Sequence, residues 1–339
     1  MKAYFVLKPF SGELRDIEIP SPGPDEVLIK VDSAGICGTD VHIFKGERKI
    51  KLPMILGHEF SGIVSKVGSN VEDLKVGEKV TVNPNINCGK CYRCRIGQPH
   101  YCENWRAVGI HIPGGFAEYV VAPAKNVYKL PENMDLEKAA FSEPLACCLH
   151  GQDKLNIEHG DEVLIIGSGP IGLIHLQLTR LRGASTIIVS DLFDWKLNIA
   201  KELGADYVIN PSKEHLSERV LDITGGRGVD KVIEASGSIK AFEEGLSCLG
   251  NEGAMLVFGV APEDEWARIS PFKIYKKELR IVGSFVNPFT TERAIKLLAS
   301  GRITVDRLIT HRIKLENMLE YMLKLAHKKI DSLKILVKP

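Results

Sequence analysis

The stretch Val163-Leu-Ile-Ile-Gly167-Ser-Gly-Pro-Ile-Gly172 decides the fold of the second half of the chain. Its four apolar residues predict a buried strand, and the Gly-x-Gly-x-x-Gly spacing leads directly into a segment with helical periodicity. In this context Gly167 allows a tight turn, Gly169 allows the backbone to approach a pyrophosphate, and Gly172 allows the helix to pack on the strand. The helix N-terminus offers N–H groups to a phosphate. The stretch therefore predicts a dinucleotide-binding βαβ unit.

An acidic residue, Asp191, ends the next predicted strand, about 20 residues further on. A carboxylate at this point accepts hydrogen bonds from the ribose hydroxyls and repels a 2′-phosphate, which favours NAD over NADP. No arginine follows it in 192–195, although Lys196 can reach the adenosine end; a solvated loop acid is the alternative. The residues that we expect to bind the cofactor are Gly167, Gly169, Pro170, Ile171, Gly172, Asp191, Lys196, Phe258, Val260, Ser284 and Phe285.

Apolar strands alternate with helical segments between residues 161 and 286. This rhythm is typical of a parallel sheet that is covered by helices on both faces. Helices are expected over 171–182 and 195–203, with Gly204 ending the second. We therefore predict an α/β fold with a doubly wound, six-stranded parallel sheet of the Rossmann type. Its strands are expected at 163–166, 186–190, 207–209, 231–234, 255–258 and 279–284.

The regions on either side have a different pattern. Short apolar runs bounded by turn residues, such as 26–31, 63–67 and 79–82, predict a β-rich first domain, and a helix over 136–150 is expected to lead out of it. The rhythm of the second domain ends after Asn287-Pro288. The remaining segments are expected to pack on the first domain as a helix at 291–300, a strand at 309–313, a helix at 315–328 and a strand at 333–337.

Composition limits the function classes. The chain has 339 residues with 44% hydrophobic content, enough for two domains with cores of their own. Lys and Arg number 44 against 43 Asp and Glu, so the formal charge of +1 creates no field that attracts nucleic acid or an anionic membrane. The chain shows no apolar leader and no long apolar run. We expect a soluble, cytoplasmic protein whose partners are small molecules.

Four cysteines, Cys88, Cys91, Cys94 and Cys102, lie in one loop with the spacing Cys-x2-Cys-x2-Cys-x7-Cys. Four thiolates close a tetrahedral shell around zinc and leave no position for a substrate. Two disulfides or four free thiols are the alternatives, but so dense a cluster in a cytosolic context more often binds metal. The loop therefore predicts a structural zinc site.

Two further segments contain possible ligands for an open metal site, Gly35-Ile-Cys37-Gly-Thr39-Asp40-Val-His42 and Gly57-His-Glu-Phe-Ser-Gly62. A single Cys or His is more often an ordinary core or surface residue. However, Gly57-His-Glu-x2-Gly62-x5-Gly68 resembles the zinc signature of the medium-chain alcohol and polyol dehydrogenases, and the resemblance extends over the whole chain. It implies a GroES-like catalytic domain at 1–145, an NAD-binding domain at 146–286 and a C-terminal segment, 287–339, that returns to the catalytic domain.

The resemblance also implies roles for single residues. Cys37 and His58 would be ligands of a catalytic zinc, Asp40 would orient His58, and Glu59 would be a ligand that exchanges on and off the ion. Glu143 stands where the alcohol dehydrogenases have a second cysteine, as in the sorbitol, arabinitol, threonine and sugar-acid dehydrogenases. A surface or N-terminal helix acid is the alternative for Glu143.

The reaction that the resemblance implies is oxidation of an alcohol by NAD. Zinc would lower the pKa of the substrate hydroxyl, and Thr39 and His42 would relay its proton to solvent; a plain surface histidine is the alternative for His42. Two zinc ions per chain and a homodimer or homotetramer are implied as well.

The substrate is less well defined by the residues. The segment 283–289 resembles arabinitol-type enzymes, so we predict a secondary hydroxyl of an arabinitol-like or sorbitol-like polyol or sugar alcohol, which is oxidised reversibly to a ketone. The segment 108–118 resembles threonine and sugar-acid dehydrogenases, which are the second choice. A zinc-bearing nucleic-acid binding protein is a remote alternative that leaves the glycine motif unexplained.

Overall fold

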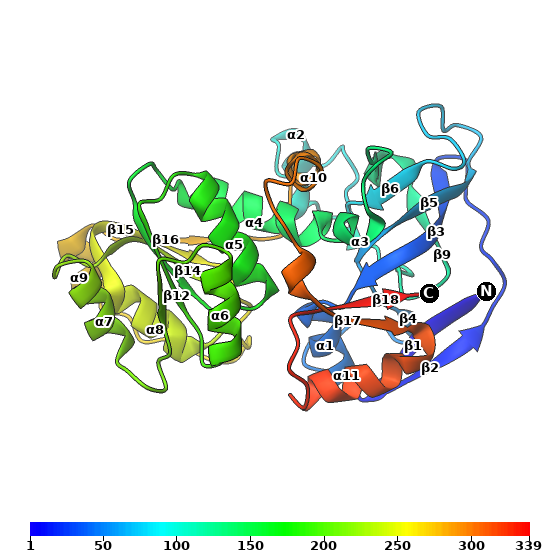
Figure 1. Ribbon diagram of the computed structural model, residues 1–339. Coiled ribbons are helices and arrows are strands. Elements are labelled where there is room, and N and C mark those ends of the chain that lie inside the picture. Colours follow the sequence, from blue (N-terminus) through cyan, green and yellow to red (C-terminus); the bar gives the residue numbers. More distant parts are fainter. The chain divides into compact units, whose positions relative to one another are not determined.

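The computed structural model describes residues 1–339 and divides the chain into two compact units (Figure 1). One unit consists of Met1–Ala146 and Asn287–Pro339, and the other of Cys147–Val286. The helix α4 (Ser142–Leu155) runs through the boundary. None of the helices combines the length and the apolar character that a membrane span requires.

The second unit contains the predicted six-stranded parallel sheet. Its strand order is β13-β12-β11-β14-β15-β16, and every neighbouring pair is parallel. Four residues in a row are buried in β11, which explains its uninterrupted apolar sequence: both faces of the strand are covered. The strands are β11 (Glu162–Ile166), β12 (Thr186–Ser190), β13 (Tyr207–Ile209), β14 (Val229–Glu234), β15 (Leu249–Val257) and β16 (Arg280–Gly283).

Helices lie on both faces of this sheet. The helices α5 (Pro170–Leu181) and α6 (Asp194–Glu202) lie on one face, and α7 (Leu216–Ile223) and α8 (Ile239–Cys248) on the other (Figure 1). Pro170 occupies the first turn of α5, where its missing N–H costs nothing. The short helix α9 (Pro271–Lys277) precedes β16.

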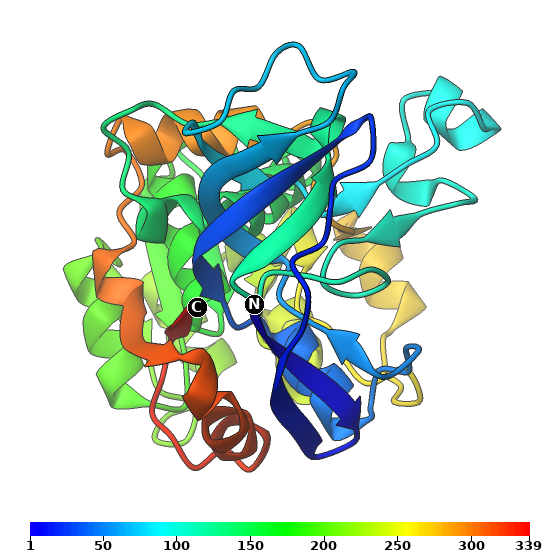
Figure 2. The same ribbon diagram turned by 90° about the vertical axis from the view of Figure 1, so that its right-hand side faces the viewer.

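The first unit is built around a mostly antiparallel sheet with β3 near its centre. Two strands of the C-terminal segment belong to this sheet: β18 pairs with β3, placing Leu336 opposite Gly35, and β17 pairs with β18. The two ends of the chain lie side by side (Figures 1 and 2). The strands are β10 (Val127–Lys129), β6 (Lys79–Val82), β5 (Glu59–Val67), β3 (Glu26–Gly35), β18 (Lys334–Lys338) and β17 (Ile309–Lys314), with β9 (Tyr119–Pro123) paired to β3.

Smaller elements complete this unit. The C-terminal helix α11 packs on α1, and Met318 and Met322 of α11 share a core with Phe44 of α1. The helix α1 is therefore held by a segment that lies far away in the sequence. These elements are β1 (Lys2–Lys8), β2 (Ser11–Asp16), β4 (Met54–Ile55), α1 (Gly38–Lys45), β7 (Asn85–Ile86), α2 (Tyr92–Arg95), β8 (Arg106–Ala107), α10 (Thr291–Ala299) and α11 (Met318–Ala326).

The single helix expected over 136–150 is wrong. The structure has α3 (Leu136–Ala139), a break, and then α4, which starts at Ser142. The cause is Pro144: inside a continuous helix its ring would collide with the carbonyl of Ala140 and it could donate no hydrogen bond. In the first turn of a new helix neither problem arises. The predicted helix over 315–328 likewise starts late, because 315–317 form a 3-10 turn before α11.

Candidate metal centres and cofactor site

The four cysteines of the predicted structural zinc loop converge on one point. Their sulfur atoms all lie within 4.8 Å of one another, and none forms a disulfide. The Sγ atoms of Cys91 and Cys94 are 3.5 Å apart and those of Cys91 and Cys102 are 3.8 Å apart. A tetrahedron with Zn–S bonds of about 2.3 Å has edges of about 3.8 Å, so the donor set fits zinc. In Figure 2 this part of the chain projects from the body of its unit.

Backbone N–H groups of the loop donate hydrogen bonds to these sulfur atoms and change the pKa of the thiols. Backbone amides at Lys90 and Cys91 lower the pKa of the Cys88 thiol to about 6, whereas burial raises that of Cys94 to about 12. Amide donors also reach Cys102 from Cys88, at 3.3 Å, and from Asn104, at 3.4 Å. A bound divalent cation would favour the thiolate form of all four.

The second cluster is formed by Cys37, His58 and Glu59, whose ligand atoms also lie within 4.8 Å of one another. Cys37 immediately precedes α1, and Glu59 starts β5 directly opposite Gly35 of β3. The sheet register therefore brings the two segments together. His58 and Glu59 are only 6% and 2% exposed, so this cluster, unlike the cysteine loop, is held inside the unit.

The fully buried Asp40 connects two members of the second cluster. One carboxylate oxygen accepts a hydrogen bond from the backbone N–H of Cys37 at 2.9 Å, and the other lies 3.4 Å from Nδ1 of His58. This arrangement leaves Nε2 of His58 for a metal ion. Burial opposes a charged His58 imidazole, but the charges of Asp40 and Cys37 outweigh it and raise its pKa well above the usual value.

Lys334 belongs to the second cluster as well, and we did not predict it. Its Nζ lies 2.5 Å from Oε2 of Glu59 and donates to the carbonyl of Ile36 at 3.2 Å, with both side chains of the ion pair buried. Burial opposes the charge of Lys334, but the charges of Glu59 and Cys37 raise its pKa above the usual value. The sequence feature that could have indicated this role is the position of Lys334 directly before the apolar run of the last strand.

The other predicted members lie around this cluster. Glu143, in the first turn of α4, is buried, and its charge contributes to the raised pKa of Lys334, although it is not one of the three converging ligands. Thr39 lies in the first turn of α1, and His42 follows one turn later. The ring of His42 is 45% exposed, and its Nδ1 lies 2.6 Å from Oε2 of Glu47.

The glycine motif has the geometry of a phosphate cradle. Gly167 has a φ of +98°, and a Cβ on Gly172 would lie 1.8 Å from the carbonyl oxygen of Gly167, so both positions require glycine. A Cβ on Gly169 would meet no protein atom within 4 Å. The protein thus leaves open the space next to the N-terminus of α5 where a pyrophosphate would approach.

The acid of the cofactor site is joined to this cradle. Asp191 accepts hydrogen bonds from the backbone N–H of Ser168 at 2.7 Å and of Phe193 at 3.0 Å. The ammonium group of Lys196 lies 4.9 Å from the ring centre of Phe193 and 5.5 Å from that of Trp195. All of these residues follow the carboxyl ends of β11 and β12.

The remaining predicted cofactor residues also follow the carboxyl ends of strands. Phe258 and Val260 come after β15, and Ser284 and Phe285 after β16. Val260 and Phe285 are exposed, whereas Phe258 packs edge-on against the ring of His175. In the strand order of this sheet, the direction of winding reverses between β11 and β14, and dinucleotides bind in the crevice at that point.

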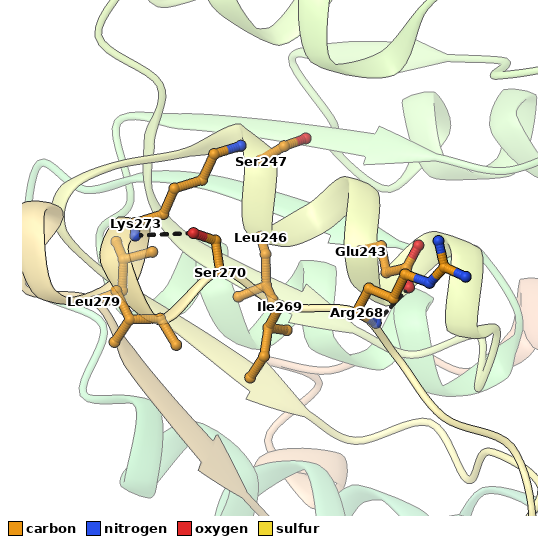
Figure 3. A pocket seen from close by; sticks show the side chains of 9 residues that line it. Glu243, Leu246, Ser247, Arg268, Ile269, Ser270, Lys273 and Leu279 are labelled. Carbon is orange, nitrogen blue, oxygen red and sulfur yellow. Dashed lines mark hydrogen bonds between the residues drawn. The ribbon is translucent and has the colours of Figure 1, made fainter.

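A cavity of about 340 Å³ in the second unit lies elsewhere (Figure 3). It is lined by Leu246 and Ser247 at the end of α8, by Ser270 and Lys273 of the α9 region, and by Leu279. These residues precede β15 and β16, so the cavity lies at the amino ends of the strands. It is not the dinucleotide site.

Comparison with known proteins agrees with this geometry. Residues 23–132 match the family described as alcohol dehydrogenase GroES-like domain, and residues 170–300 match the family described as zinc-binding dehydrogenase. L-threonine 3-dehydrogenase of Pyrococcus furiosus is 40% identical, with 93% of this chain and 92% of the relative covered. D-arabinitol dehydrogenase 1 of Uromyces fabae is 37% identical, with 100% and 97% covered.

A solved structure described as a zinc-binding dehydrogenase of Sinorhizobium meliloti, bound to NADP, is 42% identical. It superposes with a TM-score of 0.95 over 100% of this chain and 99% of that one. With the zinc ligand sets and the phosphate cradle in place, the chain belongs to the zinc-dependent, NAD(P)-using medium-chain alcohol and polyol dehydrogenases.

Proposed function

We propose that this dehydrogenase oxidises the secondary hydroxyl of a small polyol or sugar alcohol to a ketone with NAD. The main support is the convergence of the half-buried Cys37 with the buried His58, together with the buried carboxylate of Glu143, whose charge acts on the same cluster through Lys334. The likeness to an arabinitol dehydrogenase over the whole chain supports this reading. L-Threonine, whose hydroxyl is also secondary, is the second candidate, because a threonine dehydrogenase is 40% identical.

We assign Cys37 and His58 to hold the catalytic zinc. Asp40 fixes the orientation of the His58 ring through Nδ1, and the same carboxylate holds the Cys37 backbone. When bound, zinc would supply a Lewis acid that lowers the pKa of the substrate hydroxyl, and NAD would supply the hydride acceptor. If Glu143 binds the ion, its carboxylate would donate less charge than a thiolate would. The four-cysteine loop is assigned to a second, structural zinc.

Thr39 and His42 are assigned to proton transfer. The Thr39 hydroxyl lies two residues after Cys37 and can accept and pass on the proton that the substrate loses. His42 is suited to release that proton, because its ring is partly in solvent and its Nδ1 is anchored by Glu47. Both side chains come from α1, which also carries Asp40.

Discrimination between the two cofactors is assigned to Asp191. Its carboxylate is held at the cradle by the Ser168 and Phe193 amides, where it would meet the adenosine ribose and would repel a 2′-phosphate. The similar structure from S. meliloti is bound to NADP. The preference of this chain for NAD or NADP therefore has to be measured.

The test is a panel of D-arabinitol, sorbitol, aldonates and L-threonine, each with NAD and NADP. We expect kcat/KM to be highest for a polyol with NAD, and Asp191→Ala to reduce the preference for NAD by at least about tenfold. A higher kcat/KM for L-threonine would establish the second candidate. A native preference for NADP would overturn the role of Asp191.

A further inference from the structure

The buried carboxylate of Glu234 has no part in the reaction described so far. Glu234 ends β14 and is 2% exposed. No lysine or arginine pairs with it, so its burial depends on hydrogen bonds alone. A buried carboxylate destabilises the folded protein unless its oxygens accept enough hydrogen bonds.

The hydrogen bonds of Glu234 all come from the backbone and a hydroxyl of the loop that follows it. Oε1 accepts from the N–H of Ser236 at 2.7 Å, the hydroxyl of Ser236 at 2.5 Å and the N–H of Gly237 at 3.0 Å. Oε2 accepts from the N–H of Gly237 at 3.2 Å. These charge-assisted bonds impose one conformation on the loop 235–237.

The same residue also holds the loop after β15. The backbone carbonyl of Glu234 accepts from the N–H groups of Phe258, at 3.0 Å, and Gly259, at 2.8 Å. A Cβ on Gly259 would lie 2.7 Å from Oε2 of Glu234 and 2.1 Å from the backbone nitrogen of Gly237. The loops 235–237 and 258–260 are therefore packed backbone to backbone around the carboxylate.

The glycine cradle touches this assembly. The N–H of Ala235 donates to the carbonyl of Ile166 at 2.9 Å, and a Cβ on Gly167 would lie 3.1 Å from the backbone nitrogen of Ser236. The loops that follow β11, β14 and β15 thus form one wall at the carboxyl edge of the sheet. It stands where the winding direction reverses, at the crevice for the dinucleotide.

We propose that Glu234 is a positioning residue for the cofactor: its carboxylate holds the loop 235–237, against which the loop 258–260 packs, in the conformation that the dinucleotide binds. Glu234 does not touch the cofactor, because it is buried and its oxygens are occupied by the loop. The proposal rests on the use of NAD proposed above.

The test compares two substitutions in the full-length, zinc-loaded enzyme. Glu234→Gln removes the charge and places an amide donor against the donors of the loop. Glu162→Gln makes the same change at the amino end of β11, where the carboxylate pairs with Arg227 at 3.1 Å. We expect the Kd for NADH, measured by fluorescence titration, to rise about tenfold in Glu234→Gln and less than about twofold in Glu162→Gln.

Positioning is distinguished from general stabilisation by three further readouts. We expect KM for NAD to follow Kd while kcat at saturating NAD stays within about twofold of the native value. A lower Tm with unchanged Kd would overturn the proposal, and so would an equal change in Glu162→Gln. If Glu234→Gln does not fold, Ser236→Ala removes one of its hydrogen bonds and should raise Kd about twofold to fivefold; an unchanged Kd in Ser236→Ala would then overturn the proposal. Failure of the native enzyme to bind NADH at all would instead overturn the proposed function.

Discussion

The two candidate metal centres of the first unit are constructed in opposite ways. The cysteine loop takes its four ligands from the short segment 88–102, stands partly in solvent and receives its hydrogen bonds from its own backbone. In the second cluster His58 and Glu59 are buried and Cys37 is half-buried. This cluster combines the ends of two paired strands with Lys334, a residue 275 positions away from Glu59.

This difference has a physical consequence. All four ligands of the cysteine loop come from one short segment, so a metal ion bound there would contribute folding free energy to that segment. The buried cluster needs the sheet in place before its ligands converge, and its charges are already balanced by Asp40 and Lys334. We therefore expect loss of metal to reduce stability at the first centre and turnover at the second.

The largest expected effect is that of Cys37→Ser on turnover. Because it removes a ligand from the proposed catalytic zinc, we expect kcat/KM to fall more than about a hundredfold. Circular dichroism and Tm should stay close to native, because β3 and β5 do not depend on the ion. Native turnover in a variant with its zinc content measured would contradict the assignment.

Next in size is the effect of Cys94→Ser on stability. A structural zinc contributes several kcal/mol, so we expect Tm to fall by roughly 10 °C and one zinc to be lost per chain. The matched control is His100→Ala, which changes the same loop but removes no ligand, and should retain its zinc in elemental analysis. An unchanged Tm with one zinc fewer would show that the loop is not a structural brace.

The substitution Lys334→Met tests whether the buried centre is balanced by charge. Without the ammonium group, Glu59 is left buried and unpaired in the metal-free protein, a loss of about 3 kcal/mol. Zinc can then offset that loss through Glu59, so we expect the zinc-induced rise in Tm to be larger than in the native protein. Lys338→Met in the same strand is the control; an equal rise in both variants and the native protein would refute the prediction.

The smallest expected effect concerns acid. Arg312 and Lys338 lower the pKa of Glu137, so this carboxylate stabilises the native state above its usual pKa of 4.5 and loses that contribution as pH falls through its lower native pKa. Since Lys338 lies in β18, acid should loosen the strand that carries Lys334. Between pH 6 and 3.5 we expect Tm to fall further in the native protein than in Lys338→Met. The difference between the two falls should be below about 3 °C. Equal slopes would show that the pair is too exposed to matter.

Local signals predicted most of the second unit. The strand, glycine and helix pattern around Gly167 placed β11 and α5 within one residue, because the pattern depends on neighbours in sequence. The convergence of the four cysteines at 88–102 was also predictable, because their spacing is short. The error at 136–150 shows where apolar periodicity fails as a predictor. The periodicity continues across Pro144, but the helix is interrupted before it.

What the sequence alone determined is the set of short-range features: a parallel sheet, a phosphate cradle, a four-thiol loop, and the residue types of a zinc dehydrogenase. What the tertiary structure decided is which distant charges meet. Lys334 faces Glu59 only because β18 pairs with β3, and Glu234 is enclosed only because the loops after β11, β14 and β15 pack together. No periodicity or motif spacing in the sequence predicts either contact. Whether a charge is buried and paired depends on strand register and on the packing of other segments.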